Sequence, residues 1–162
     1  SPKHVENFLY LVDNGMYDTT IFHRIIDGFM IQGGDIEDRN GAGGYAGIWY
    51  GYCNGQMANA DGQIYTSENC QQQDWTVPDE ANNGLVHEPA VLAMAKTSNP
   101  NTAGSQFYIV PSDSKPSHLD GIHTVFGAVI SGMDHVDAIS EVLTGNADKP
   151  VEDVRLIQAY RS

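Results

Sequence analysis

Residues 22–35 read FHRIIDGFMIQGGD and contain one permanent cation, Arg24, inside an otherwise apolar run. A glycine turn follows, and a second apolar run then carries one amide, Gln32. Because side chains alternate faces along a strand, Arg24 points away from its two neighbours, and Met30 shares a face with Gln32. The stretch therefore predicts a patch in which the hydrogen-bond donors of Arg24 and Gln32 are surrounded by aromatic and thioether side chains. It contains no nucleophile and no obvious acid–base pair, which suits a reaction in which a bond rotates and none is broken.

Two later segments continue this pattern. Residues 103–110 read AGSQFYIV and predict a strand with Gln106 and Tyr108 on one face. Residues 117–127 read SHLDGIHTVFG, in which Asp120 and the glycine after it make a turn. The residues that flank this turn are His118, Leu119 and His123.

The chain resembles the cyclophilin family of peptidyl-prolyl cis-trans isomerases in three blocks that occur in the family's order: FHRIIDGFMIQGGD, GSQFYIV and HLDGIHTVFG. The stretch VLAMAKTSNPNTAGSQFY extends the second block upstream, and KPVEDVRLIQA resembles the family's last strand. The resemblance covers most of the chain outside roughly residues 45–74. Three long blocks in order are more specific than any short motif.

The resemblance implies a mainly β fold, in which a closed antiparallel β-barrel is capped by two helices. Residues 1–162 would form a single cyclophilin-like domain with an insertion at about 45–74. Family members usually open with a strand hairpin before the first helix. Because a helix pattern appears at once here, we expect that hairpin, and any signal peptide, to be missing from this chain.

The function implied by the resemblance is the cis-trans isomerisation of Xaa-Pro peptide bonds in protein folding. The alternative is a cyclophilin-like module that binds proline peptides with little or no turnover. Arg24 favours the enzyme, since binding alone needs an apolar slot but not the donor. A hydrolase lacks support because no Ser, His and Asp stand in an activating context. The expected partners are proline-containing peptides and unfolded or flexible protein segments, bound by a monomer that needs no cofactor or metal.

Site residues follow from the resemblance position by position. Three fall on the family's catalytic positions: Arg24, Gln32 and Phe29. Those that fall on substrate-binding positions are Met30, Ala95, Lys96, Gln106, Tyr108, His118, Leu119 and His123. Each also has an ordinary interpretation: Phe29 would be a core residue in an unknown chain, and Arg24 would be half of a surface ion pair.

Three places depart from the commonest family pattern. His118 stands where many members carry a tryptophan that helps hold cyclosporin, which argues against tight cyclosporin binding but leaves isomerisation intact. Tyr108 stands where many members have phenylalanine, so its hydroxyl needs a partner or water. The stretch 96–99 reads KTSN and differs from the Asn-Ala-Gly version of some members.

The composition fits one folded domain and narrows the partners. The chain has 162 residues, 41% of them hydrophobic, which is enough for a sizeable core. Asp and Glu number 21 against 8 Lys and Arg, for a net charge of −13. This balance argues against nucleic acid and anionic membranes, since both need clustered cations. No stretch approaches the roughly 20 apolar residues that a membrane span requires.

Local patterns predict two helices and several short strands. Pro2 suits the first turn of a helix that Asn14 and Gly15 end. Its expected apolar stripe is Val5, Phe8, Leu9 and Val12. A second helix is expected over 134–143, with Val136, Ile139 and Leu143 facing inward. The expected strands are 20–26, 30–33, 91–95, 105–110, 124–129 and 154–159.

The insertion at 45–74 is rich in Gly, Asn, Gln and Tyr and contains both cysteines, Cys53 and Cys70. A disulfide between them would stabilise the loop by roughly 3 kcal/mol. It would favour a secreted or periplasmic location over a cytoplasmic one. The rival interpretations are two free thiols or half a metal site, although zinc needs more ligands and no histidine lies nearby. We expect a compact flap beside the proline slot, anchored by Trp49, Tyr50 and Tyr52.

Overall fold

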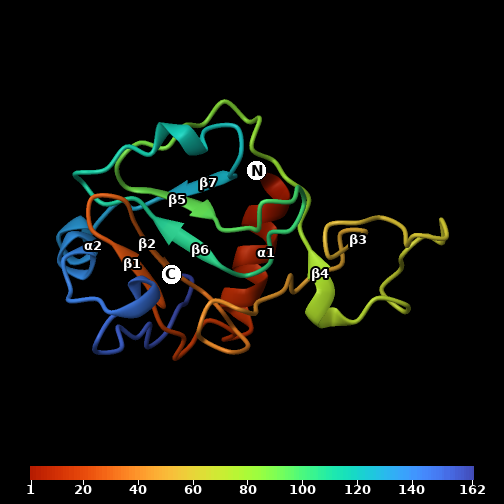
Figure 1. Ribbon diagram of the computed structural model, residues 1–162, viewed down its shortest axis with the longest axis horizontal. Helices are drawn as coiled ribbons and strands as arrows, with labels where there is room; N and C mark the ends of the chain where they lie inside the picture. The colour runs from red at the N-terminus through yellow and green to blue at the C-terminus, as the bar shows by residue number, and fades with distance from the viewer.

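The computed structural model describes residues 1–162 and is mainly β with two α-helices (Figure 1). Its main sheet has five strands in the order β1-β2-β6-β5-β7, and every neighbouring pair is antiparallel. These strands are β1 (Arg24–Ile26), β2 (Met30–Gly33), β5 (Val91–Met94), β6 (Phe107–Ile109) and β7 (Val125–Ala128). A separate two-stranded sheet pairs β3 (Tyr52–Cys53) with β4 (Trp75–Thr76). Short 3₁₀ turns lie at Gln72–Asp74, Ser117–Leu119 and Asn146–Asp148.

The main sheet is open, so the prediction of a closed barrel is wrong for this structure. The expected last strand, 154–159, does not form. This segment pairs with residues 20–22 at one bridge, between Ile21 and Arg155. A few backbone hydrogen bonds support the bridge, among them Leu156 N–H to the Thr20 carbonyl at 2.8 Å. The residues that follow are mostly exposed, so too few are paired to make a strand. The other expected strands are present, most of them shorter than predicted.

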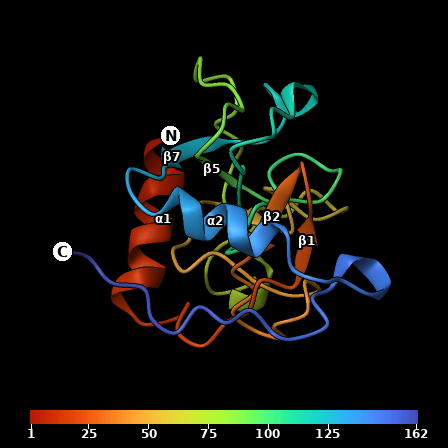
Figure 2. The same cartoon turned by 90° about the vertical axis from the view of Figure 1, so that its left-hand side faces the viewer.

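Both α-helices pack on one face of the main sheet. α1 (Pro2–Asp13) contacts β7, and α2 (Met133–Ser140) contacts β1 and β2 (Figure 2). Because α2 ends at Ser140, Leu143 lies beyond it and is 77% exposed, although it was expected to face inward. Neither helix has the length and hydropathy to cross a membrane.

The buried stripe of α1 is partly polar, which differs from the apolar stripe that the sequence predicts. Val5 is 36% exposed, whereas His4 and Asn7 are buried. Both buried polar side chains have partners: His4 Nδ1 lies 2.8 Å from a carboxylate oxygen of Glu80, and Asn7 Nδ2 donates to the Gly104 carbonyl at 3.0 Å. These contacts fix the helix to two loops, which a purely apolar stripe could not do.

The sheet has a structural face and a second, smaller buried face. Beneath the helices, four strands contribute to the main apolar core, with Ile25, Ile31, Met94 and Phe107. Because side chains alternate along each strand, the intervening residues point the other way. Their buried cluster on the opposite face consists of Met30, Ala93, Tyr108, Val110 and Val125. This second face is free of α-helices and is available for a site.

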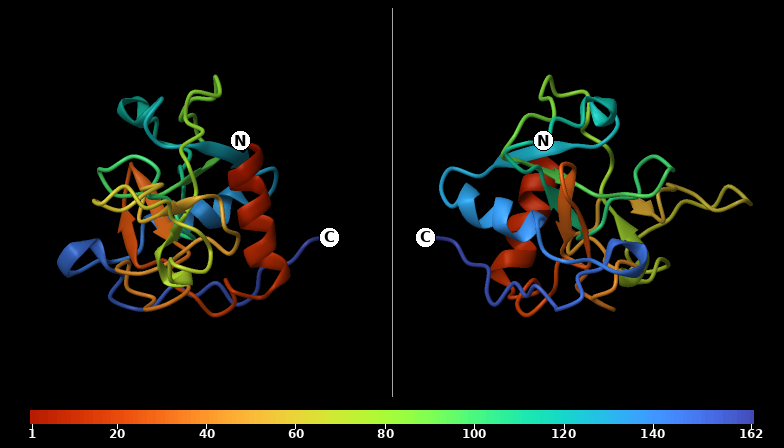
Figure 3. Two further views of the ribbon diagram at one scale, coloured as in Figure 1. Left: turned by 90° about the vertical axis from the view of Figure 1, so that its right-hand side faces the viewer. Right: turned by 60° about the vertical axis from the view of Figure 1, so that its left-hand side comes forward.

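The insertion, residues 45–74, extends away from the main sheet, as two views of the ribbon show (Figures 1 and 3). Cys53 on β3 is bonded to Cys70, with the two Cα atoms 6.0 Å apart. The Tyr50 hydroxyl donates to the Glu6 carboxylate at 2.9 Å and so fastens the base of the insertion to α1. The large exposed apolar side chains of the insertion are Met57 and Ile64.

We expect the free energy of unfolding to fall as the pH is lowered from about 6.5, because three histidines that are buried or partly buried resist protonation. Burial lowers the pKa of His4, His23 and His123, so the unfolded chain binds protons there that the folded chain does not. Each group contributes a slope of up to about 1.4 kcal/mol per pH unit. Urea unfolding from about pH 6.5 down to about 5 measures this slope.

His23→Phe should reduce that slope, since it removes one of the three groups. The matched control, His135→Phe, changes an exposed histidine on α2 and should leave the slope as it is in the parent. Identical slopes in the parent and in both variants would contradict the assignment.

Candidate functional site

A row of directly opposed residues crosses the sheet on its helix-free face. Arg24 on β1 lies opposite Gln32 on β2. Gln32 in turn lies opposite Tyr108 on β6, and Tyr108 lies opposite Ala93 on β5. Opposed residues of antiparallel strands point to the same face. The strand register therefore brings a cation, an amide and an apolar floor together.

Hydrogen bonds orient the polar side chains of this row. Gln106 Nε2 donates to the carbonyls of Gly41 and Gly43 at 2.9 and 2.7 Å. Its Oε1 therefore faces Gln32 and accepts from Gln32 Nε2 at 2.9 Å. Gln32 Oε1 is left facing Arg24, 3.5 Å from Nη1. Because a carbonyl only accepts, the two loop carbonyls decide which way both amides point.

The buried carboxylate of Asp35 organises the loop that supplies those carbonyls. Its oxygens accept hydrogen bonds from five backbone N–H groups at 2.9–3.3 Å. The donors are Glu37, Asp38, Asn40, Gly41 and Gly43. Burial acts to raise the pKa of Asp35, but the backbone donors outweigh it and the pKa is lowered. The carboxylate is therefore ionised at neutral pH and holds the loop in one conformation.

Apolar side chains form a floor and a rim beside the polar row. Met30 and Tyr108 are 2% and 3% exposed and make the floor. Phe29, Ala95 and Leu119 are partly exposed and pack against the same cluster, so they make the rim. The composition of this surface suits contact with a small apolar ring.

The other predicted residues lie around this floor. His118 is exposed, and its ring centroid is 5.7 Å from that of Phe29. The ring of His123 meets Tyr108 edge-on with centroids 5.8 Å apart, and burial lowers the pKa of His123, so it is neutral near pH 7. The ammonium of Lys96 is turned toward Asp79, 3.6 Å away.

Arg24 is half exposed and only weakly paired. Its Nε lies 3.7 Å from a carboxylate oxygen of Asp148, and the two side chains are 42% and 49% exposed. Exposed pairs of this kind contribute little to stability. The guanidinium keeps its charge and has five N–H donors, so most of them are available to a ligand.

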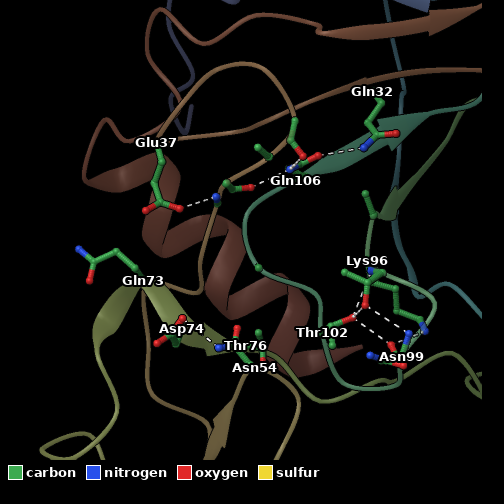
Figure 4. Close-up of a pocket in the computed structure, with 17 residues that line it drawn as sticks. Gln32, Glu37, Asn54, Gln73, Asp74, Thr76, Lys96, Asn99, Thr102 and Gln106 are labelled. Carbon is green, nitrogen blue, oxygen red and sulfur yellow. Dashed lines mark hydrogen bonds between the residues drawn. The ribbon is translucent and has the colours of Figure 1, made fainter. Parts of the chain in front are cut away.

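A polar cavity of about 520 Å³ opens beside the apolar floor (Figure 4). Gln32 and Gln106 border it on one side, joined by the hydrogen bond that Figure 4 draws. On the side of the insertion, Asn54 donates to Asp74 at 2.9 Å, and both side chains line the cavity. The insertion therefore forms part of the wall of the candidate site. No group of three or more His, Cys, Asp or Glu side chains is placed to hold a metal ion.

Two groups that the site depends on were missed by reasoning from the sequence. Asp35 stands in the quoted block, but its role appears only once its burial and its backbone donors are known. His87 lies in a stretch without a recognisable pattern, and its Nε2 is 2.7 Å from the Tyr108 hydroxyl. The hydroxyl itself was the available signal, because a buried tyrosine requires a hydrogen-bond partner.

Comparison with known proteins decides the family. The family model described as cyclophilin type peptidyl-prolyl cis-trans isomerase/CLD matches residues 1–161. The chain is a cyclophilin. Its relatives are named peptidyl-prolyl cis-trans isomerases, which places this cyclophilin in that class of enzymes.

Individual relatives agree with this assignment. Peptidyl-prolyl cis-trans isomerase CYP18-1 of Arabidopsis thaliana is 39% identical over 155 residues, which cover 96% of this chain and 79% of the relative. Human peptidyl-prolyl cis-trans isomerase-like 1 is 38% identical over 162 residues, which cover 100% of this chain and 81% of the relative. A cyclophilin-type isomerase of Cryptosporidium parvum, crystallised in the presence of the dipeptide Ala-Pro, has a TM-score of 0.75 at 29% identity, covering 99% of this chain and 86% of its own.

Asp35→Asn should loosen the loop over 37–43, because a neutral amide oxygen replaces a charged acceptor of five N–H groups. We expect the free energy of unfolding to drop by about 2–3 kcal/mol and the amides of Gly41 and Gly43 to exchange faster. Hydrogen exchange followed by NMR measures both effects. Asp38→Asn, on the exposed side of the same loop, is the control, and equal effects of the two variants would rule out the special role of Asp35.

Proposed function

We propose that this cyclophilin accelerates rotation about Xaa-Pro bonds in unfolded or flexible protein segments, with Arg24 donating a hydrogen bond to the prolyl nitrogen. The observation that carries the proposal is the register of Arg24 with Gln32, on the face that also holds the floor of Met30 and Tyr108. The Cryptosporidium relative crystallised in the presence of Ala-Pro supports an Xaa-Pro ligand. The proposed step requires no cofactor.

The chemistry of the rotating bond explains why a guanidinium is useful. The barrier of about 18–20 kcal/mol exists because the nitrogen lone pair is delocalised into the carbonyl. At the twisted transition state this delocalisation is lost, and the nitrogen can accept a hydrogen bond. A donor aimed at that nitrogen binds the transition state better than the ground state, which is the requirement for catalysis. Arg24 remains protonated and supplies such a donor.

The energy required exceeds what one hydrogen bond provides. Uncatalysed exchange takes about 10–100 s, so reaching milliseconds requires the barrier to fall by about 5–7 kcal/mol. A charge-assisted hydrogen bond contributes roughly 1.5–3 kcal/mol. Donors that are already oriented before the substrate arrives supply the remainder. The fixed amides of Gln32 and Gln106 fit this requirement, because loop carbonyls orient them without the substrate.

Substrate contacts follow from the placement of the other residues. The proline ring would rest on Met30 and Tyr108, between the side chains of Phe29 and Leu119, with His123 at the edge. Gln32 and Gln106 would hold the substrate backbone. Ala95 and Lys96, which also line the polar cavity, would border the residues before the proline. Exposed His118 offers little surface to cyclosporin, so we expect weak binding of that peptide.

Arg24→Ala should reduce kcat/KM by about 10–100-fold while the fold survives, because only the donor to the prolyl nitrogen is lost. A protease-coupled isomerisation assay measures the rate, and circular dichroism checks the fold. Arg39→Ala removes another exposed arginine outside the site and serves as the control. A kcat/KM of Arg24→Ala within a factor of two of the parent would refute the mechanism.

Activity should be nearly constant between about pH 6 and 8, because the proposed step transfers no proton. The lowered pKa of His123, caused chiefly by its burial, means that the histidine at the slot edge is already neutral over most of this range. The measurement is kcat/KM against pH, with circular dichroism recorded at each point. A bell-shaped profile in a folded protein would instead indicate an acid–base group.

The insertion contributes to substrate recognition in this proposal. Asn54 and Asp74 flank the disulfide-bonded cysteines and line the polar cavity, so the position of the cavity wall depends on the Cys53–Cys70 link. In this proposal the insertion contacts only those peptides that have further residues besides the Xaa-Pro pair. A disulfide of this kind suits an oxidising compartment, which we propose as the location of the protein.

Reduction of the disulfide should change kcat/KM for long peptides more than for a minimal Ala-Pro substrate, because only the long peptides reach the insertion. The double variant Cys53→Ser/Cys70→Ser should behave like the reduced parent and should not respond to reductant. Equal changes for short and long substrates would remove the recognition role of the insertion.

A further inference from the structure

A chain of three hydrogen-bonded polar side chains runs from buried Tyr108 in the apolar floor through buried His87 to Asp120, which is partly exposed. His87 Nε2 is 2.7 Å from the Tyr108 hydroxyl, and His87 Nδ1 is 2.7 Å from a carboxylate oxygen of Asp120. The backbone N–H of His87 donates to the same carboxylate oxygen at 2.8 Å. The rings of His87 and Tyr108 are nearly parallel, with an interplanar angle of 10°. His87 therefore connects strand β6, which carries Tyr108, to the turn that carries Asp120.

Hydrogen-bond chemistry assigns a direction to this chain. The hydrogen bonds from His87 lower the pKa of Asp120, so its carboxylate is ionised and only accepts. Nδ1 of His87 must then carry a proton and donate it to Asp120, which leaves Nε2 facing Tyr108. Burial raises the pKa of Tyr108 well above its usual range, so the hydroxyl keeps its proton and is hydrogen-bonded to Nε2. The hydroxyl therefore points toward His87 and not into the slot.

The two ends of the chain belong to opposite walls of the slot. Tyr108 is part of the floor on β6, whereas Asp120 directly follows Leu119, a residue of the rim. The backbone bonds of that turn are local, as in Asp120 N–H to the Ser117 carbonyl at 3.2 Å. The turn therefore depends on side-chain contacts for its position relative to the sheet, and Asp120 makes two of them with His87.

We propose that His87 is a positioning residue of the proline slot: through Asp120 and Tyr108 it holds the rim at a fixed distance from the floor and keeps the tyrosine hydroxyl out of the apolar surface. His87 does not touch the substrate. Its effect is on proline affinity, because Arg24 and Gln32 lie on other strands and are oriented by a separate set of hydrogen bonds. The inference rests on the proposed function only in taking the floor as the place where proline binds.

The test is a double-mutant cycle read by affinity and by rate. His87→Phe should weaken the binding of an Ala-Ala-Pro-Phe peptide about tenfold, because it leaves a buried hydroxyl without a partner and leaves Asp120 with only the backbone N–H of residue 87. Tyr108→Phe, which keeps the ring, should weaken binding about threefold. The double variant should bind no more weakly than His87→Phe alone, since the unpaired hydroxyl is gone. The exchange rate of the saturated enzyme should stay within about twofold of the parent in His87→Phe.

Affinity is measured by NMR titration and the rate by exchange spectroscopy on the same samples. Losses that multiply in the double variant, a folded His87→Phe that binds within about twofold of the parent, or a fall in rate without a loss of affinity would each overturn the proposal. Because titration requires no turnover, an inactive parent would refute the proposed isomerase function while the affinity cycle still decides the role of His87.

A second variant covers the case in which His87→Phe does not fold. Asp120→Ala, on a partly exposed turn, should weaken peptide binding about fivefold by releasing the rim. Asp113→Ala removes an exposed carboxylate from the same stretch of chain and is the matched control, as His135→Phe is for the histidine. Equal binding by Asp120→Ala and Asp113→Ala would overturn the proposal.

Discussion

The carboxylate of Asp35 is the constraint on which the site depends. A buried charge is tolerated only where hydrogen bonds replace its hydration. Here the replacement comes from five backbone N–H groups of one loop, so satisfying the charge and folding the loop are the same event. The loop then presents two carbonyls in fixed positions, and these orient Gln106, Gln32 and finally the environment of Arg24. The polar side chains of the candidate site are thus arranged by a buried acid that lies outside their row.

Strand register performs the second part of this arrangement. Antiparallel pairing sets Arg24, Gln32 and Tyr108 in one row, and the alternation of side chains sends the large aliphatic residues between them into the main core. Shifting one strand by a single residue would exchange the two faces. The strand pairing that buries the main core therefore also places the residues of the candidate site. An incorrect register would disrupt the core and the site together.

Much of this was predictable from sequence, and the failures have identifiable causes. The hairpin at 22–35 and the faces of Arg24, Gln32 and Tyr108 followed from period-two alternation, which needs only local information. The closed barrel was not obtained, because closure depends on how many residues at 154–159 find partners, a long-range quantity that no local pattern contains. The sequence predicts that Val5 faces inward on α1, because the spacing of apolar residues contains no information about distant hydrogen-bond partners. In the structure His4 and Asn7 are buried instead, since each finds a polar partner in a distant loop. His87 was missed for the same reason, since its role exists only through contacts with distant residues.

The insertion is largely independent of the main sheet. Its strand β3 pairs with β4, which directly follows the insertion, and not with the main sheet, and its cysteines bond within it. Its attachments to the body include Tyr50, which bonds to α1, and Gly47, whose N–H donates to Asn7. The hydrogen bonds of residues 57–69 all lie within the insertion, so this part can be lengthened, shortened or replaced without disturbing the register of the five strands of the main sheet. In evolutionary terms this part of the insertion is a separable module, whose length and sequence can vary while the row of Arg24, Gln32 and Tyr108 remains as it is.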